Sequence, residues 1–383
     1  MPRLIHFTLS SQVSILSSLA ETATTLEYLR LFIGQVYTRA FSQPAPSLHK
    51  DGNTRTLEAF AGALDCEICA FDKWCARREE SICKAQAGIS EVGTGEGLPV
   101  TLLNLEKSLQ DEFALSFSVL VSILPSLPIT QSRTSSPASK TSRLLDTLFI
   151  QVQEHISMSD LITADALMRV FVKSAEPVWG MVSKWLQEGM PVREGTGLSI
   201  TGGGLEEEFF IEDNEIGLLD PDFWADGYEL REGTAIAVKD DESNRPKTIP
   251  VFLAHVAVEV LSSGKATGLL RALGIPPTVS STRPLIHQSF SDLLMTHTNF
   301  SDKTIRTSLS TDALIGVVYD ELTPFCRATG VLLTSVLVED CDLWKHLGAI
   351  EDLYLMRRGD AMSHFTNILF AKVGDILISM NAS

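Results

Sequence analysis

The segment Thr56–Ile82, with the sequence TLEAFAGALDCEICAFDKWCARREESI, has the hydrophobic spacing of an amphipathic helix. The charged residues Arg77–Glu80 supply a polar face. The apolar residues recur at intervals of three and four and therefore share one side of the helix: Leu57, Phe60, Ala61, Leu64, Ile68, Phe71, Trp74 and Cys75. This segment predicts a long helix that buries one side against its neighbours.

Similar spacing recurs on both sides of this helix, whereas the strict alternation of a strand is scarce. For a helix over residues 159–188, we expect Ser159 to cap the first turn and Gly189 to follow the last one. The other helical patterns cover residues 14–41, 101–124, 144–156 and 251–273, with shorter pieces toward the C-terminus. Together they predict an all-α protein of stacked helical bundles.

Two regions interrupt the helical pattern. Residues 125–143 are rich in Ser, Thr and Pro, which is typical of a loop or flexible linker. Residues 190–250 combine the Gly202–Gly204 run with an acidic and aromatic block, and a short strand is expected at Phe209–Ile211. We therefore expect one irregular, aromatic-rich insertion (about residues 190–250) within the helical fold.

The composition is that of a globular, acidic chain. Its 383 residues include 31 Lys and Arg against 48 Asp and Glu, for a net charge of −17, and 44% of them are hydrophobic. A field of that sign repels phosphate backbones, so nucleic acid is not an expected partner. The most apolar stretch, residues 113–129, is shorter than a bilayer span and contains Pro125 and Pro128, so no membrane association is expected. The six cysteines are ordinary for a cytosolic protein with reduced thiols.

The cysteines and histidines do not fall into a metal-binding or catalytic pattern. Cys66, Cys69, Cys75 and Cys83 include a Cys-x-x-Cys pair, but in one helix the outer two would lie about 25 Å apart. We expect these cysteines to be small buried hydrophobic residues rather than zinc ligands. The eight histidines contain no His-Glu-x-x-His frame and are expected to be structural or exposed.

The glycine-rich and acidic motifs do not indicate a particular binding site either. Gly264-Lys265 lacks the upstream glycine and the downstream Ser or Thr of a phosphate-binding loop, because Glu259 and Ala266 occupy those positions. Glu206–Glu208 are expected to form a solvated acidic turn. The sequence thus predicts no catalytic, cofactor or metal site and no enzymatic activity.

A series of short motifs carries more information through its order than any one motif does alone. The series consists of Trp179-x5-Trp185-Leu186-x2-Gly189, Glu208-Phe209-Phe210-Ile211, Phe223-Trp224-x3-Tyr228, Ile249-Pro250-x-Phe252-Leu253, Gly264-Lys265 and Gly359-Asp360-x3-His364-Phe365. It resembles the gamma-tubulin complex component family, whose members share two helical GRIP domains. Within that family, Thr56–Glu80 is most similar to the larger fifth- and sixth-component type.

The resemblance assigns a packing role to the signature positions, since large aromatic side chains mostly bury surface. We expect five of them to fix an irregular crossing between helices and not to form a ligand site: Phe209, Phe210, Trp224, Tyr228 and Phe252. The full set of signature positions is Trp185, Phe209, Phe210, Ile211, Phe223, Trp224, Tyr228, Pro250, Phe252, Leu253, Gly264, Lys265, Gly359, Asp360 and Phe365.

The resemblance further implies a scaffold that supports microtubule nucleation. Family members associate side by side through the N-terminal GRIP domain and bind gamma-tubulin through the C-terminal one. For this chain it implies an N-terminal GRIP domain over residues 1–305, which includes the 125–143 linker, and the truncated start of the C-terminal domain over 306–383. The expected partners are other gamma-tubulin complex components, bound laterally through the N-terminal helices, whereas gamma-tubulin binding is expected to be lost or weakened. The implied location is the cytoplasm and cytoskeleton, at a microtubule-organising centre or spindle pole.

Two other hypotheses stay open at the level of sequence. An unrelated all-helical adaptor or tethering protein without enzymatic activity would stack long helices without the aromatic-rich insertion. A helical enzyme with an unrecognised site would lose its activity when the relevant carboxylates or histidines are replaced. For the last helices, from about residue 310 onward, we expect exposed apolar side chains and the lowest stability in the chain.

Overall fold

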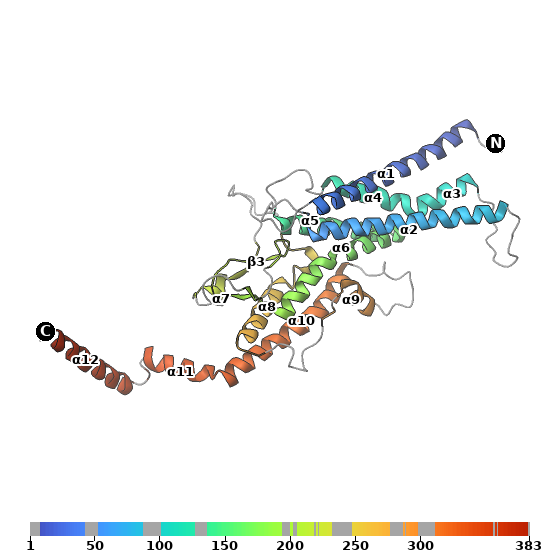
Figure 1. Ribbon diagram of the computed structural model, residues 1–383. Coiled ribbons are helices and arrows are strands. Elements are labelled where there is room, and N and C mark those ends of the chain that lie inside the picture. The colour runs from blue at the N-terminus through green and yellow to red at the C-terminus, as the bar shows by residue number, and fades with distance from the viewer. Residues whose placement is uncertain are drawn as a thin grey trace, which may run out of the picture. The chain divides into compact units, whose positions relative to one another are not determined.

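The computed structural model describes residues 8–42, 53–86, 101–126, 136–193, 200–201, 205–217, 220, 222–231, 247–275, 286–287, 289–297, 311–354, 357 and 359–381. It is mostly helical, with short antiparallel strand pairs in one irregular region, which confirms the predicted fold class (Figure 1). The chain divides into two compact units, Met1–Cys326 and Arg327–Ser383.

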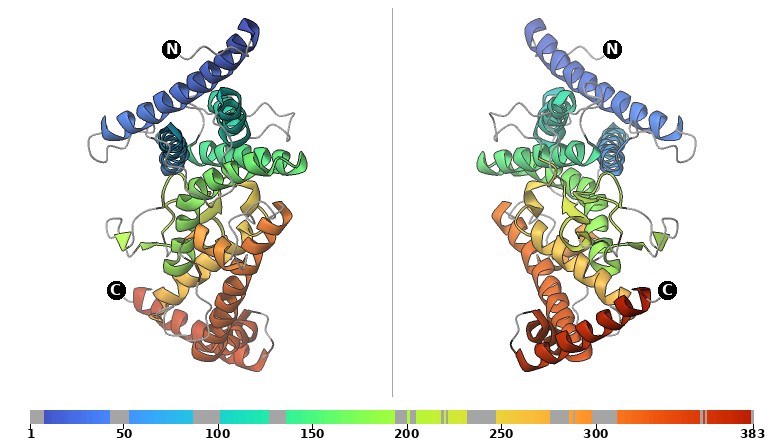
Figure 2. Two further views of the ribbon diagram at one scale, coloured as in Figure 1. Left: turned by 90° about the vertical axis from the view of Figure 1, so that its right-hand side faces the viewer. Right: turned by 90° about the vertical axis from the view of Figure 1, so that its left-hand side faces the viewer.

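The first unit begins with a group of helices that pack on one another. Its elements are α1 (Leu9–Ser42), α2 (Arg55–Gln86), α3 (Leu102–Leu109), a π-helical stretch (Gln110–Ala114), α4 (Leu115–Ile123) and a 3₁₀ turn (Leu124–Ser126). The helix predicted over residues 56–82 is confirmed within α2. The rings of Phe32 on α1 and Phe60 on α2 meet at a centroid distance of 6.0 Å. One side of α1 packs against α2 and α4, and its opposite side faces away from the bundle (Figure 2).

The centre of the first unit is formed by α5 (Pro137–Ser157) and α6 (Leu161–Glu188). Helix α6 packs against α2 and α5, and it completely buries Phe171 and Trp179. Arg169 ties α6 to α2, because its Nε and Nη2 donate hydrogen bonds to the Glu67 carboxylate at 2.9 and 2.8 Å. Helix α6 therefore lies at the centre of the hydrophobic core of the first unit.

Two boundaries in this region differ from the sequence prediction. Residues 137–143 are the first turns of α5 and not part of a linker, because Ser136 caps the helix through Ser139 N–H (3.3 Å) and proline suits the first helical position. The cap of α6 is Asp160 and not Ser159: Asp160 accepts Thr163 N–H at 3.3 Å, while Ser159 adopts a left-handed φ of 61°. Residues 127–135 of the expected linker lie outside the described residues.

The irregular segment after α6 contains two antiparallel strand pairs and one short helix. The strand expected at Phe209–Ile211 begins only at Ile211, because a hydrogen bond from Phe209 N–H to the Glu206 carbonyl (2.9 Å) closes a turn before it. The run Gly202–Gly204 lies outside the described residues. The elements are β1 (Val192–Arg193), which pairs with β2 (Ile200–Thr201), and β3 (Ile211–Asp213), which pairs with β4 (Tyr228–Leu230) beyond α7 (Phe223–Asp226).

The first unit closes with a 3₁₀ turn (Val251–Leu253), α8 (Ala257–Ala272), α9 (Phe290–His297) and the first part of α10 (Thr311–Ser335). By length and composition, the segment Asp312–Asp340 would be able to cross a membrane. A core helix of a soluble protein has the same properties, and Leu314, Val318 and Leu322 are completely buried in the first unit. A single helix of this kind is therefore weak evidence for a membrane span.

The second unit holds the rest of α10, a π-helical stretch (Val336–Asp340), α11 (Leu343–Tyr354) and α12 (Gly359–Asn381). Many of its apolar side chains are exposed, as the sequence led us to expect: Trp344, Leu347, Ile350, Tyr354, Phe365, Ile368, Leu369, Phe370 and Val373. The low stability expected for this part of the chain stays a prediction.

Three carboxylates of the first unit hold the irregular segments in place by accepting backbone N–H groups from distant parts of the chain. Glu208 accepts the N–H groups at the start of α2, Glu176 on α6 accepts Phe290 N–H (3.1 Å) at the start of α9, and Asp146 on α5 accepts Val251 N–H (2.7 Å). The positive end of a helix favours such an anionic partner. These contacts join elements that lie far apart in the sequence.

Asp146 gives the fold a pH dependence that can be measured. Burial raises the pKa of its carboxyl group, against the opposing hydrogen bond from Val251 N–H. An acid with a higher pKa in the folded state binds more protons when folded, so its contribution to the free energy of unfolding decreases as the pH rises above about 4 and through the folded pKa. We expect Asp146→Asn to flatten this decrease in urea unfolding between pH 4 and 7. The exposed Glu154→Gln on the same helix is the control, and equal slopes for both variants would contradict the prediction.

Candidate functional site

The C-terminal end of α6 crosses α8 at a contact between a tryptophan and glycines. Trp185 is buried, and its Nε1 donates a hydrogen bond to the Val260 carbonyl at 2.9 Å. A Cβ atom on Gly264 would lie 2.6 Å from Cδ1 of this indole and closer still to its Nε1. Gly189 has a φ of 74°, and a Cβ there would lie 2.8 Å from Gly268 Cα. The crossing therefore requires glycine directly after α6 and on α8.

Aromatic side chains of the irregular segment pack around this crossing. The ring centroids of Tyr228 and Phe209 lie 5.6 and 6.2 Å from that of Trp185, and Phe210 lies 4.6 Å from Phe209. The Tyr228 hydroxyl donates to the Pro191 carbonyl at 2.7 Å. These four aromatic residues are buried, together with Ile211 and Phe223. The structure thus brings the central members of the sequence-derived set together.

The expected packing role is wrong for the Trp224 side chain, which is 43% exposed. On α7 the preceding residue, Phe223, points into the core, and this turns Trp224 outward. Its backbone has a role instead, because Lys265 Nζ donates to the carbonyls of Trp224 (3.1 Å) and Ala225 (3.2 Å) at the end of α7. Burial lowers the pKa of the Lys265 ammonium, against the opposing effect of nearby carboxylates.

The remaining signature positions lie away from this cluster. Phe252 belongs to a second aromatic group, with ring centroids 5.6 Å from Phe171 and 5.7 Å from Phe290. Its neighbours Pro250 and Leu253 are also buried. Gly359, Asp360 and Phe365 belong to the second unit and are exposed there, as expected for the last helices, so their packing role stays a prediction.

The expected burial of the α2 cysteines also needs correction. Cys66, Cys69 and Cys83 are exposed and not buried, because they lie on the side of α2 opposite Phe60 and Leu64. Within the described part of the chain, no group of three or more metal-binding side chains occurs.

The acidic turn Glu206–Glu208 is not uniformly solvated. Glu207 is exposed, but the Glu208 side chain is buried and accepts hydrogen bonds from Arg55 N–H (2.7 Å), Thr56 N–H (2.8 Å) and the Thr141 hydroxyl (2.7 Å). Sequence reasoning missed this role, since no local motif connects Glu208 with residues so far away along the chain.

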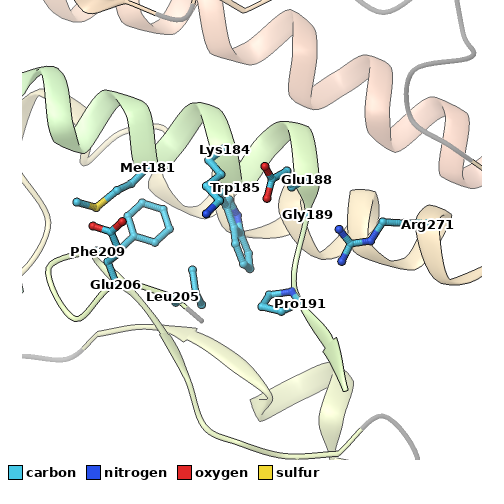
Figure 3. A pocket seen from close by; sticks show the side chains of 10 residues that line it. All are labelled: Met181, Lys184, Trp185, Glu188, Gly189, Pro191, Leu205, Glu206, Phe209 and Arg271. Atoms are coloured by element: carbon cyan, nitrogen blue, oxygen red, sulfur yellow. The ribbon is translucent and has the colours of Figure 1, made fainter. Parts of the chain in front are cut away.

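A small pocket lies beside the crossing of α6 and α8 (Figure 3). Its volume is about 50 Å³, and the buried Trp185 and Phe209 rings form its floor. The lining also includes Met181, Lys184, Glu188, Gly189, Pro191, Leu205, Glu206 and Arg271. These residues supply apolar surface and charge, which suits the pocket to binding a ligand.

The sequence was compared with known protein families and with curated proteins. Residues 1–328 match the family described as gamma tubulin complex component N-terminal. No curated protein matches the chain. The family match covers the whole first unit, including the crossing, the aromatic cluster and the pocket.

Proposed function

The chain belongs to the gamma-tubulin complex component family, and we propose that it is a scaffold subunit of the gamma-tubulin ring complex. In this role it associates laterally with other components and supports microtubule nucleation at a microtubule-organising centre or spindle pole, without enzymatic activity. Gamma-tubulin is a second proposed partner. The fifth- or sixth-component subtype and the domain boundary at residue 305 stay predictions, and the family match extends to residue 328.

The observation that carries the proposal is the outward side of α1. Leu9, Val13 and Leu16 recur at helical spacing and are 79%, 56% and 58% exposed. Residues 8–20 contain no charged side chain, although the chain carries a net charge of −17. Depletion of charge around exposed apolar residues is characteristic of the centre of a protein–protein interface. We call these three residues the α1 outer face.

Charged substitutions on the α1 outer face test the lateral association. The double variant Val13→Asp, Leu16→Asp is expected to reduce recovery of the other complex components about tenfold in a pull-down from cell extract, because it places carboxylates in an apolar interface. The fold should be unaffected, since both side chains are exposed. The matched control is Gln35→Asp, an exposed position farther along α1.

The pull-down also decides the proposal as a whole. With the natural sequence as bait, we expect the other components to be recovered, and gamma-tubulin is measured separately in the same eluate. Absence of every component, while circular dichroism shows a folded helical protein, would overturn the scaffold function. Equal recovery with the double variant and with Gln35→Asp would overturn the role of the α1 outer face alone.

A further inference from the structure

The pocket beside the α6–α8 crossing has a rigid apolar floor. The Trp185 indole is held by its hydrogen bond to the Val260 carbonyl and by its contact with Gly264, while the Phe209 ring packs beside it. Met181 and Leu205 extend the apolar lining (Figure 3). One water occupies about 10–15 Å³ by a comparable measure. A volume of about 50 Å³ therefore has room for a branched aliphatic side chain.

Two cations and two carboxylates line the pocket, and one of the carboxylates is already in an ion pair. Glu206 forms an ion pair with Arg55 at an Oε1–Nη1 distance of 2.6 Å. The other charged lining residues are the cations Lys184 and Arg271 and the carboxylate Glu188. Arg271 is oriented by a hydrogen bond from Nη2 to the Met190 carbonyl (3.0 Å). The guanidinium group turns toward the pocket in Figure 3. Two cations therefore line this pocket in a chain whose net charge is −17.

We propose that this pocket binds a short acidic peptide segment of a partner protein. One leucine-sized side chain occupies the cavity, and an adjacent carboxylate pairs with Lys184 and Arg271. The acidic remainder of the surface repels such a segment, so the two cations direct it to this place. Because the floor is fixed before binding, little ordering is required of the protein. The site is separate from the α1 outer face and does not depend on the proposed lateral association.

Fluorescence anisotropy with labelled peptides tests the ligand class. The full chain is titrated at low ionic strength against fluorescein-labelled Gly-Asp-Leu-Asp-Gly, with Gly-Asp-Ala-Asp-Gly and Gly-Lys-Leu-Lys-Gly as comparison peptides. We expect the first peptide to bind about fivefold more tightly than either of the others, because only it matches both the cavity and the charge. Equal binding of the three peptides, or no saturable binding of the first, would overturn the proposal.

Two charge reversals on the same helix test the position of the site. Lys184→Glu is expected to weaken binding of the aspartate–leucine peptide about tenfold. Lys173→Glu is the matched control, because Lys173 is exposed on α6 but does not line the pocket. Both lysines are exposed, so both variants should fold, and circular dichroism checks this. The same loss of binding in both variants would place the peptide elsewhere and reject the site.

Discussion

Replacing Gly264 by alanine is expected to lower the free energy of unfolding by about 3 kcal/mol, the combined effect of overpacking and a broken buried hydrogen bond. The new methyl group would overlap the Trp185 indole, which is buried and hydrogen-bonded to the Val260 carbonyl. The steric overlap is removed only if the Trp185 ring moves, and this movement also disturbs the contacts of the ring with Phe209 and Tyr228. Urea unfolding followed by tryptophan fluorescence measures the effect, since four of the five tryptophans lie in the first unit.

Gly180→Ala is the matched control for this prediction. Gly180 lies on α6 with open space around its Cα, so alanine should leave the stability unchanged or raise it by up to about 1 kcal/mol. A second test combines Gly264→Ala with Trp185→Phe, because the smaller ring provides room for the methyl group. The double variant should then lose at least about 1 kcal/mol less than the sum of the single losses. Additive losses would show that the two residues are not in steric conflict.

The helices could be predicted from the sequence because their signal is local. In α2 and α6 the apolar residues recur at helical spacing over many turns, and the structure confirms both helices. The boundary at Pro137 was missed because the Ser- and Pro-rich composition of a linker also suits a helix start, where Ser136 caps and Pro137 initiates. Composition alone does not separate these two cases.

The details of the site could not be predicted, because they depend on residues that are distant in sequence. Residue 264 must be glycine because the Trp185 ring leaves no space for a side chain, and Glu208 is buried because it binds N–H groups at the start of α2. Neither contact can be recognised from a local sequence pattern. The burial of Phe223 and the exposure of Trp224 are likewise decided by the orientation of α7 and not by residue type. For the cysteines of α2, residue type suggested burial, but their position on the helix places three of them in solvent.

The second large effect is expected from Glu208→Gln, which should lower the free energy of unfolding by about 2–3 kcal/mol. The Glu208 carboxylate is buried and accepts the N–H groups of Arg55 and Thr56, two of the unpaired donors in the first turn of α2. It also accepts the Thr141 hydroxyl from α5, so one side chain joins α2, α5 and the aromatic segment. Glutamine keeps the shape but removes the charge that favours the helix N-terminus, and it presents an NH₂ group to one of these donors.

Hydrogen exchange distinguishes this capping role from a general loss of packing. In Glu208→Gln the Arg55 and Thr56 amides should exchange faster than in the natural protein under conditions where the buried amides of α6 are unaffected, because the first turn of α2 opens locally. Thr141→Val removes only the third hydrogen bond and should cost about 1 kcal/mol without changing exchange at Arg55. Glu207→Gln is the matched control, since this neighbouring side chain is exposed. If Glu207→Gln and Glu208→Gln have equal effects, the negative charge of the turn matters only as a distant field and the buried cap has no special role.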